Sequence, residues 1–200
     1  MHFERGFKTW TERVALSMRS DLGLSPDDAL DPQLLAEHLD ARLATPYEIA
    51  GLSKVDLKQL LEVDPWGWSA VSILEDESPL IIYNPRHSKG RQASDIMHEL
   101  AHLILDHAPA TLIASPDGRF VMRSYNETQE NEANWLSWAL LLPRDALMNC
   151  KRRELSSEQI AQHYGVSEKL VNFRLQVTGV EAHMKAAARY HHKKRLRESG

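Results

Sequence analysis

The chain has 200 residues and a net charge of −4 with neutral histidines, and 42% of its residues are hydrophobic and 26% charged. These proportions are typical of a globular protein and exclude a largely disordered chain. Cys150 is the only cysteine, which excludes an intrachain disulfide bond and a zinc finger with two or more cysteine ligands. The first residues mix both charges, and no apolar run is long enough to span a membrane, so we expect a cytoplasmic protein.

Residues 4–22, 31–39 and 55–63 each place apolar side chains at helical spacing, which predicts three helices in the N-terminal part. In the second of these, Asp31 is expected to cap the helix and Pro32 to occupy its first position. Residues 68–74 and 80–83 are strand-like and are separated by a polar turn, so they predict an antiparallel hairpin.

Two longer helices are predicted next, over residues 92–107 and 127–142, and the second is expected to stop before Pro143. A short strand over residues 120–122 is expected between them. Because the helices and the hairpin occur in separate runs, the sequence predicts an α+β fold and not a repeating parallel βαβ fold.

The first of these long helices carries the motif His98-Glu99-Leu100-Ala101-His102. Residues four apart on a helix lie one turn apart on the same face, so the two imidazoles can bind one Zn²⁺. Glu99 would then lie beside the metal and accept a proton from water. We therefore expect one zinc ion per chain, bound by His98 and His102, with Glu99 as the catalytic acid/base.

A catalytic zinc site needs a third protein ligand and one open position. Glu130 and Glu132 are the candidates on the second long helix. Glu132 begins an apolar stripe that should pack inward, whereas Glu130 aligns with Asn134 and Ser137 in a stripe that we expect to face solvent. This pattern favours Glu132 as the third ligand.

Other polar residues near the motif could support the chemistry. Asp95 and Asp106 lie on the polar stripe of the motif helix and could orient the imidazoles through hydrogen bonds. Stabilisation of the oxyanion in the transition state needs a further group besides the metal. The sequence leaves four candidates for that role: Tyr83, His87, His107 and Tyr125.

The motif HELAHLIL at 98–105, together with EANWLSWALLLP at 132–143, resembles the ImmA/IrrE family of metallo-endopeptidases. The segments IYNP at 82–85 and DLGL at 21–24 are also similar, and the resemblance covers about residues 7–180. It implies a gluzincin-like core, in which a small antiparallel sheet lies beside the motif helix and the helix that bears the glutamate. It also implies the zinc ligands His98, His102 and Glu132, with Glu99 as catalytic acid/base. Trp135 stands where the family usually has Phe.

The same resemblance implies a protein substrate. Members of the family characteristically cleave a helix-turn-helix repressor and so relieve the repression of mobile-element, phage or stress-response genes. We therefore expect a zinc metallopeptidase domain over residues 1–150, and a helix-turn-helix repressor as the partner that it cleaves and inactivates.

The C-terminal region is expected to add two short helices that are similar to a helix-turn-helix. A capping box formed by Ser156 and Gln159 starts the first helix, and the turn at Gly165 leads to a second helix capped by Ser167. Basic and acidic residues nearly balance over 151–182, so direct nucleic-acid binding is possible but is less expected than packing or substrate docking. Residues 183–200 form a tail with six Lys or Arg and one acidic residue.

Two alternative functions stay open at this stage. One is a DNA-binding transcriptional regulator whose metal site is structural or vestigial. The other is a zinc peptidase of broader specificity, which would cleave many proteins instead of one repressor.

Overall fold

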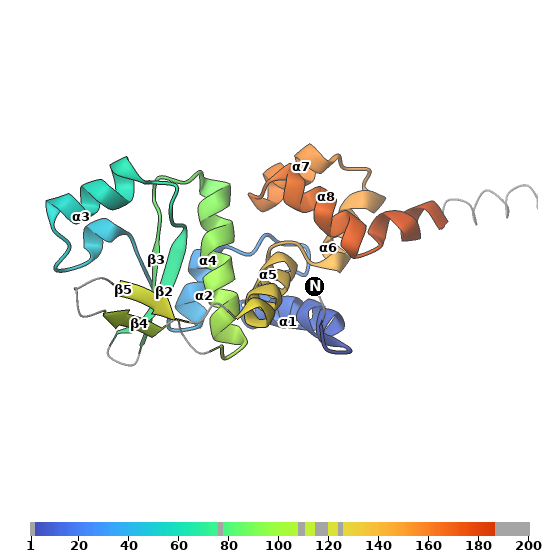
Figure 1. Ribbon diagram of the computed structural model, residues 1–200. Coiled ribbons are helices and arrows are strands. Elements are labelled where there is room, and N and C mark those ends of the chain that lie inside the picture. Colours follow the sequence, from blue (N-terminus) through green and yellow to red (C-terminus); the bar gives the residue numbers. More distant parts are fainter. Residues whose placement is uncertain (1–2, 76–77, 108–110, 115–119, 124–125, 187–200) are drawn as a thin grey trace, which may run out of the picture.

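The computed structural model describes residues 3–75, 78–107, 111–114, 120–123 and 126–186. Within these ranges the chain is mostly helical, with a three-stranded sheet and a separate pair of strands. Figure 1 shows the strands on one side of α4 (Lys89–Ile104), while α1 (Phe7–Asp21) and α5 (Glu127–Leu141) lie on the other side. The predicted α+β class is therefore confirmed. Among the described residues, no helix combines the length and the apolar content that crossing a bilayer requires.

Two short helices complete the N-terminal part. The first, α2 (Pro32–His38), begins as predicted, because the Asp31 side chain accepts a hydrogen bond from the backbone N–H of Gln33 at 2.9 Å. The second, α3 (Lys54–Lys58), continues into one turn of π-helix over Gln59–Val63. A single 3₁₀ turn, Pro46–Glu48, lies between them.

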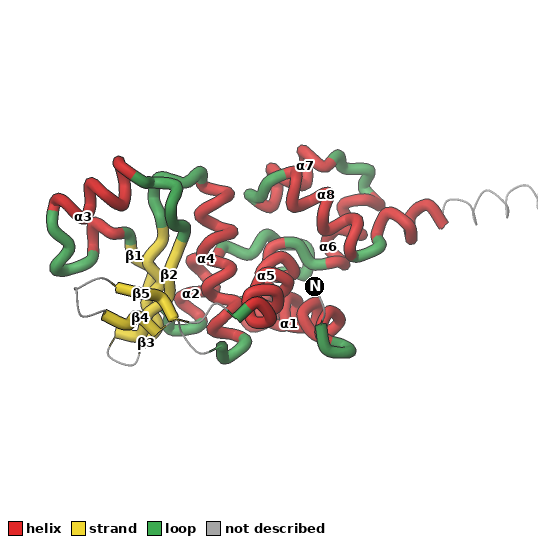
Figure 2. The backbone as a smooth tube through the Cα atoms, viewed as in Figure 1, coloured by secondary structure: helices red, strands yellow, loops and turns green. Residues whose placement is uncertain are grey.

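The three-stranded sheet has the order β1-β3-β2 and is mixed in direction. Figure 2 shows its strands, in yellow, grouped on one side of α4. β2 (Ala70–Glu75) and β3 (Ser78–Tyr83) pair antiparallel, in agreement with the predicted hairpin. β1 (Arg42–Ala44) pairs parallel with β3, which corrects the expectation of an antiparallel sheet. A strand of three residues is too short to show an alternating pattern, so the sequence did not reveal β1.

A second, two-stranded pair lies between α4 and α5 in the sequence. β4 (Thr111–Ala114) pairs antiparallel with β5 (Phe120–Arg123), and β5 coincides with the short strand predicted there. α4 begins three residues earlier than expected, whereas α5 begins and ends close to its predicted bounds. The Asn126 side chain caps α5 by accepting hydrogen bonds from the backbone N–H groups of Thr128 and Gln129.

Helix α5 is central to the packing because it contacts both α4 and α1. Its residues Ala133, Leu136 and Leu140 are fully buried in one hydrophobic core, which also contains Leu100 of α4 and Ala15 of α1. Helices α4 and α5 thus pack directly against each other where the polar residues of the motif at 98–102 lie.

The C-terminal helices share this core. They are α6 (Arg144–Arg152), α7 (Ser157–Tyr164) and α8 (Glu168–Val177), and a further helical stretch starts at Val180. Val171 and Leu175 of α8 are buried in the same cluster as α5. The turn at Gly165 also touches the start of α4, since a Cβ placed on Gly90 would lie 3.0 Å from the carbonyl oxygen of Gly165. Deleting residues 151–200 would therefore remove part of the core as well as any docking surface.

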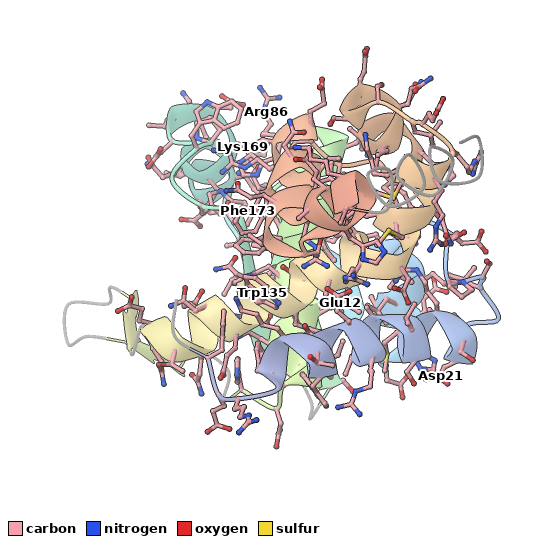
Figure 3. The ribbon with its side chains drawn as sticks, turned by 90° about the vertical axis from the view of Figure 1, so that its right-hand side faces the viewer. Glu12, Asp21, Arg86, Trp135, Lys169 and Phe173 are labelled. Atoms are coloured by element: carbon pink, nitrogen blue, oxygen red, sulfur yellow. The ribbon has the colours of Figure 1, made fainter. Side chains whose placement is uncertain are left out.

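Arg174 fastens α8 to the rest of the fold. Its guanidinium is fully buried, with Nη2 2.6 Å from Glu12 Oε1, and both Nε and Nη2 donate to the carbonyl oxygen of Leu142. The aromatic rings of Phe173 and Trp135 also meet between α8 and α5, with centroids 6.4 Å apart (Figure 3). This face of α8 is consequently used for packing.

Replacing Arg174 with Ala is expected to lower the free energy of unfolding by about 3–5 kcal/mol. The substitution leaves the Leu142 carbonyl without its donor and removes the ion pair of the Glu12 carboxylate, which keeps the hydrogen bond from the backbone N–H of Arg144 at 2.7 Å. Urea unfolding monitored by circular dichroism measures the effect. Lys169→Ala, on the exposed side of the same helix, is the control and should change stability by less than about 0.5 kcal/mol. Equal stability of the two variants would contradict the prediction.

Candidate metal centre

Two histidines of α4 face each other one helical turn apart. The Nε2 atoms of His98 and His102 are 3.1 Å apart, and the ring planes are nearly perpendicular with centroids 4.7 Å apart. Both side chains are about one-fifth exposed, so they line an accessible part of the surface between α4 and α5. The i, i+4 spacing on the helix produces this arrangement directly.

The carboxylate of Glu130 on α5 lies against both imidazoles. Its Oε2 is 3.2 Å from His98 Nε2, and its Oε1 is 3.5 Å from His102 Nε2. Among the described residues, His98, His102 and Glu130 form the one group of three side chains whose donor atoms lie close enough together to hold a metal ion.

Glu132, which the sequence analysis favoured as third ligand, lies elsewhere. Its Oε2 is 3.3 Å from His107 Nε2. The difference arises because α5 is covered on two sides, by α4 and by α1, so an apolar stripe does not identify the side that faces α4. Ser137, which we expected to face solvent together with Glu130, is only 2% exposed.

The donor set fits a zinc ion. Four ligands at 2.0–2.1 Å from a tetrahedral zinc lie about 3.3 Å from one another. The separations of 3.1, 3.2 and 3.5 Å among the three donor atoms are close to this value. Two imidazole nitrogens and one carboxylate oxygen are also the ligand types found in catalytic zinc sites, which leave the fourth position open.

Glu99 lies next to this group and is held by the sheet. The hydroxyl of Ser72, on β2, donates a hydrogen bond to Glu99 Oε2. Burial raises the pKa of the Glu99 carboxyl, although the hydrogen bond from Ser72 and the nearby His98 act in the opposite direction. Ser72 is not among the site residues expected from the sequence, where its signal is a polar residue between Val71 and Ile73 in an apolar strand.

His102 has a second imidazole partner on its far side. Its Nδ1 is 2.9 Å from Nδ1 of His107, the residue that also contacts Glu132. Burial, together with the neighbouring His98 and His107, lowers the pKa of His102 to about 4. His102 is therefore neutral near pH 7, which is the form of imidazole that binds a metal.

Asp95 does not reach the histidine pair in this structure. Its Oδ2 is 2.8 Å from Nδ1 of His87, whose buried ring stacks on Trp66 with centroids 5.4 Å apart. Arg91 Nε approaches the same carboxylate oxygen at 3.8 Å. In this structure the side-chain contact to Nδ1 of His102 comes from His107 and not from Asp95.

The remaining candidates are placed as follows. Asp106 is exposed and adopts a left-handed backbone conformation with φ of 52° just after α4. Tyr83 ends β3 and packs against the hydrophobic core. Tyr125 lies outside the described residues.

Comparisons with known proteins identify a family and a similar fold. The family described as Peptidase_M78, IrrE N-terminal-like domain, matches residues 61–176, which include both histidines and Glu130. A solved structure, titled Mycobacterium tuberculosis transcriptional regulator, shares the fold with a TM-score of 0.52 at 15% sequence identity. That match covers 84% of this chain and 46% of the other, so this chain spans less than half the length of the regulator. No curated protein matches the sequence significantly.

Proposed function

Because the chain belongs to the IrrE N-terminal-like domain family of peptidases, we propose that it is a zinc-dependent endopeptidase that cleaves and inactivates a helix-turn-helix transcriptional repressor. The observation that carries this proposal is the group formed by His98, His102 and Glu130, together with Glu99, which directly follows His98 on α4. Such a group combines a metal site with a general acid/base, the two components that metal-assisted peptide hydrolysis requires.

His98, His102 and Glu130 would hold the metal, and all three side chains are partly exposed, by 21%, 18% and 32%. A zinc ion bound there supplies a Lewis acid that polarises the scissile carbonyl and makes the attacking water more acidic. The protein holds the two imidazoles through the backbone of α4 and the carboxylate through α5, whose direct packing keeps the three side chains together.

Glu99 would move the proton. Its Oε2 accepts the hydrogen bond from Ser72, so Oε1 is available to accept a proton from the water that attacks the peptide carbonyl. The same proton then passes to the leaving amine nitrogen as the C–N bond breaks, which returns Glu99 to its carboxylate form. Burial of Glu99 favours this role because a raised pKa strengthens the base.

The substrate assignment has separate support. The resemblance to repressor-cleaving peptidases suggests a regulatory target, and the similar solved structure is titled a transcriptional regulator. We propose that residues 151–182 add a docking surface on the exposed side of α8, which includes Lys169 and Asn172. A second contact surface of this kind would supply selectivity that a short peptide groove lacks.

Proteome-wide profiling of new protein N-termini tests the function. Cells producing the wild-type chain are compared with cells producing Glu99→Gln, and we expect one dominant zinc-dependent cleavage, within a small helix-turn-helix protein. Cleavage of many unrelated proteins would instead indicate broad specificity. A sequence-specific DNA footprint made by the purified chain, without any cleavage, would contradict the proposal.

A further inference from the structure

We propose that His107 and Glu132 are positioning residues that fix the tautomer and the orientation of the metal ligand His102. This inference rests on the proposed metal site and extends it from three ligands to a connected network of five side chains. In this network, Glu132 contacts His107, and His107 contacts His102 on the side opposite to the metal.

The contacts are short and sheltered. The Nδ1 atoms of His102 and His107 are 2.9 Å apart, and their rings meet edge to face with centroids 5.0 Å apart. His107 Nε2 is 3.3 Å from Glu132 Oε2, and the side chain of His107 is only 8% exposed. Hydrogen bonds in a network with little access to water are strengthened by the low local dielectric constant.

The end of α4 places His107 where it can make these contacts. The backbone N–H of His107 donates to the carbonyl of His102 at 3.0 Å, and that of Asp106 donates to Leu103 at 3.1 Å. This pair of hydrogen bonds, with Asp106 in the left-handed conformation, is a Schellman motif. The helix terminator therefore folds His107 back over the turn that bears His102.

The hydrogen-bond directions follow from metal binding. If His102 binds the metal through Nε2, its neutral ring carries the proton on Nδ1 and donates to Nδ1 of His107. His107 must then carry its own proton on Nε2, and this N–H donates to Glu132. When both rings are neutral and Glu132 is ionised, each of the two contacts has one donor and one acceptor in the tautomer pattern that leaves His102 Nε2 free for the metal.

The proposal gives Glu132 a role distinct from that of Glu130. Glu130 reaches both Nε2 atoms directly, whereas Glu132 acts on His102 through His107. Outer partners of metal-binding histidines typically contribute about 10–100-fold to metal affinity. We expect this range for His107 and Glu132.

Zinc affinity measured by competition with a chromophoric chelator tests the inference. His107→Leu and Glu132→Gln should each weaken zinc binding about 10–100-fold. His107→Asn should retain more affinity than His107→Leu, because the amide oxygen can replace Nδ1 as acceptor. Asp106→Asn, which is adjacent and tolerates the same backbone conformation, is the matched control and should bind zinc as the wild type does.

The outcomes separate this inference from the metal site itself. Unchanged affinity in His107→Leu and Glu132→Gln, with zinc lost from His98→Ala, would overturn the positioning role alone. Complete loss of zinc from Glu132→Gln, equal to that in His98→Ala, would make Glu132 a direct ligand and would also overturn it. Stoichiometric zinc in His98→Ala would remove the metal site and the positioning role together.

A measurement on the unsubstituted protein does not depend on how the variants fold. Nitrogen-15 NMR of the zinc-loaded full chain reports which imidazole nitrogen carries a proton. We expect a proton on Nδ1 of His102 and on Nε2 of His107. A proton on Nδ1 of His107 would overturn the proposed hydrogen-bond directions.

Discussion

Glu130→Gln is expected to reduce zinc binding by more than about 100-fold, beyond the range of outer partners of metal ligands. The substitution keeps the size of the side chain but removes the negative charge that lies 3.2 Å from His98 Nε2 and 3.5 Å from His102 Nε2. A neutral amide is a much weaker zinc ligand than a carboxylate. Elemental analysis after dialysis, followed by the chelator competition, measures the change.

Two glutamates of the same helix provide the controls for this result. Glu127→Gln, in the exposed first turn of α5, should leave the zinc content at one ion per chain. Glu132→Gln should retain zinc at lower affinity, since it contacts His107 and not the two Nε2 atoms. If Glu132→Gln lost zinc while Glu130→Gln kept it, the ligand expected from the sequence would be the correct one.

The comparison of Glu130 with Glu132 shows what the sequence could predict about the site. The spacing of His98 and His102 within one helix is a local property, and it determines their relative position without knowledge of the rest of the fold. The third candidate ligand comes from another helix, so its identity depends on how α5 is rotated against α4. An apolar pattern cannot determine this rotation when the helix is packed on two sides, as α5 is.

The same distinction applies to the fold. Helix caps such as Asp31 and Ser156, and the hairpin of β2 and β3, follow from residues close in sequence and were predicted. The parallel strand β1 depends on its pairing with β3, whose partner residues lie 38 positions further along the chain. A segment of three residues carries no pattern that would predict this pairing. The role of Ser72 could not be predicted for the same reason, because it joins a strand to Glu99 on a helix.

Packing of the C-terminal helices also changes how their function can be tested. Arg174, Val171 and Leu175 are buried against the core, so a truncation would confuse loss of docking with loss of folding. Substitutions of exposed residues on α8, such as Lys169 and Asn172, leave this core in place. They would separate recognition of the proposed protein substrate from stability of the fold.

Glu99→Gln is expected to slow peptide cleavage by about 10²–10⁴-fold while zinc content and thermal stability stay close to those of the wild type. Gln can still accept the hydrogen bond from the Ser72 hydroxyl, so the local structure is retained. It cannot accept a proton from water, which removes the base and the later acid in one substitution. Steady-state cleavage of the repressor found by N-terminal profiling, with zinc analysis on the same samples, measures the effect.

Ser72→Ala tests whether the position of Glu99 contributes to the cleavage rate, because it removes the hydrogen bond to Glu99 and keeps the carboxylate. Loss of a hydrogen bond to a charged group costs about 1.5–3 kcal/mol, but here the carboxylate keeps its chemical function. We therefore expect slower cleavage than in the wild type, by about 10-fold, with zinc still bound. Cleavage by Glu99→Gln at the rate of the wild type would show that another residue is the base. Cleavage by Ser72→Ala as slow as that by Glu99→Gln would show that the Ser72 contact, and not proton transfer alone, limits the reaction.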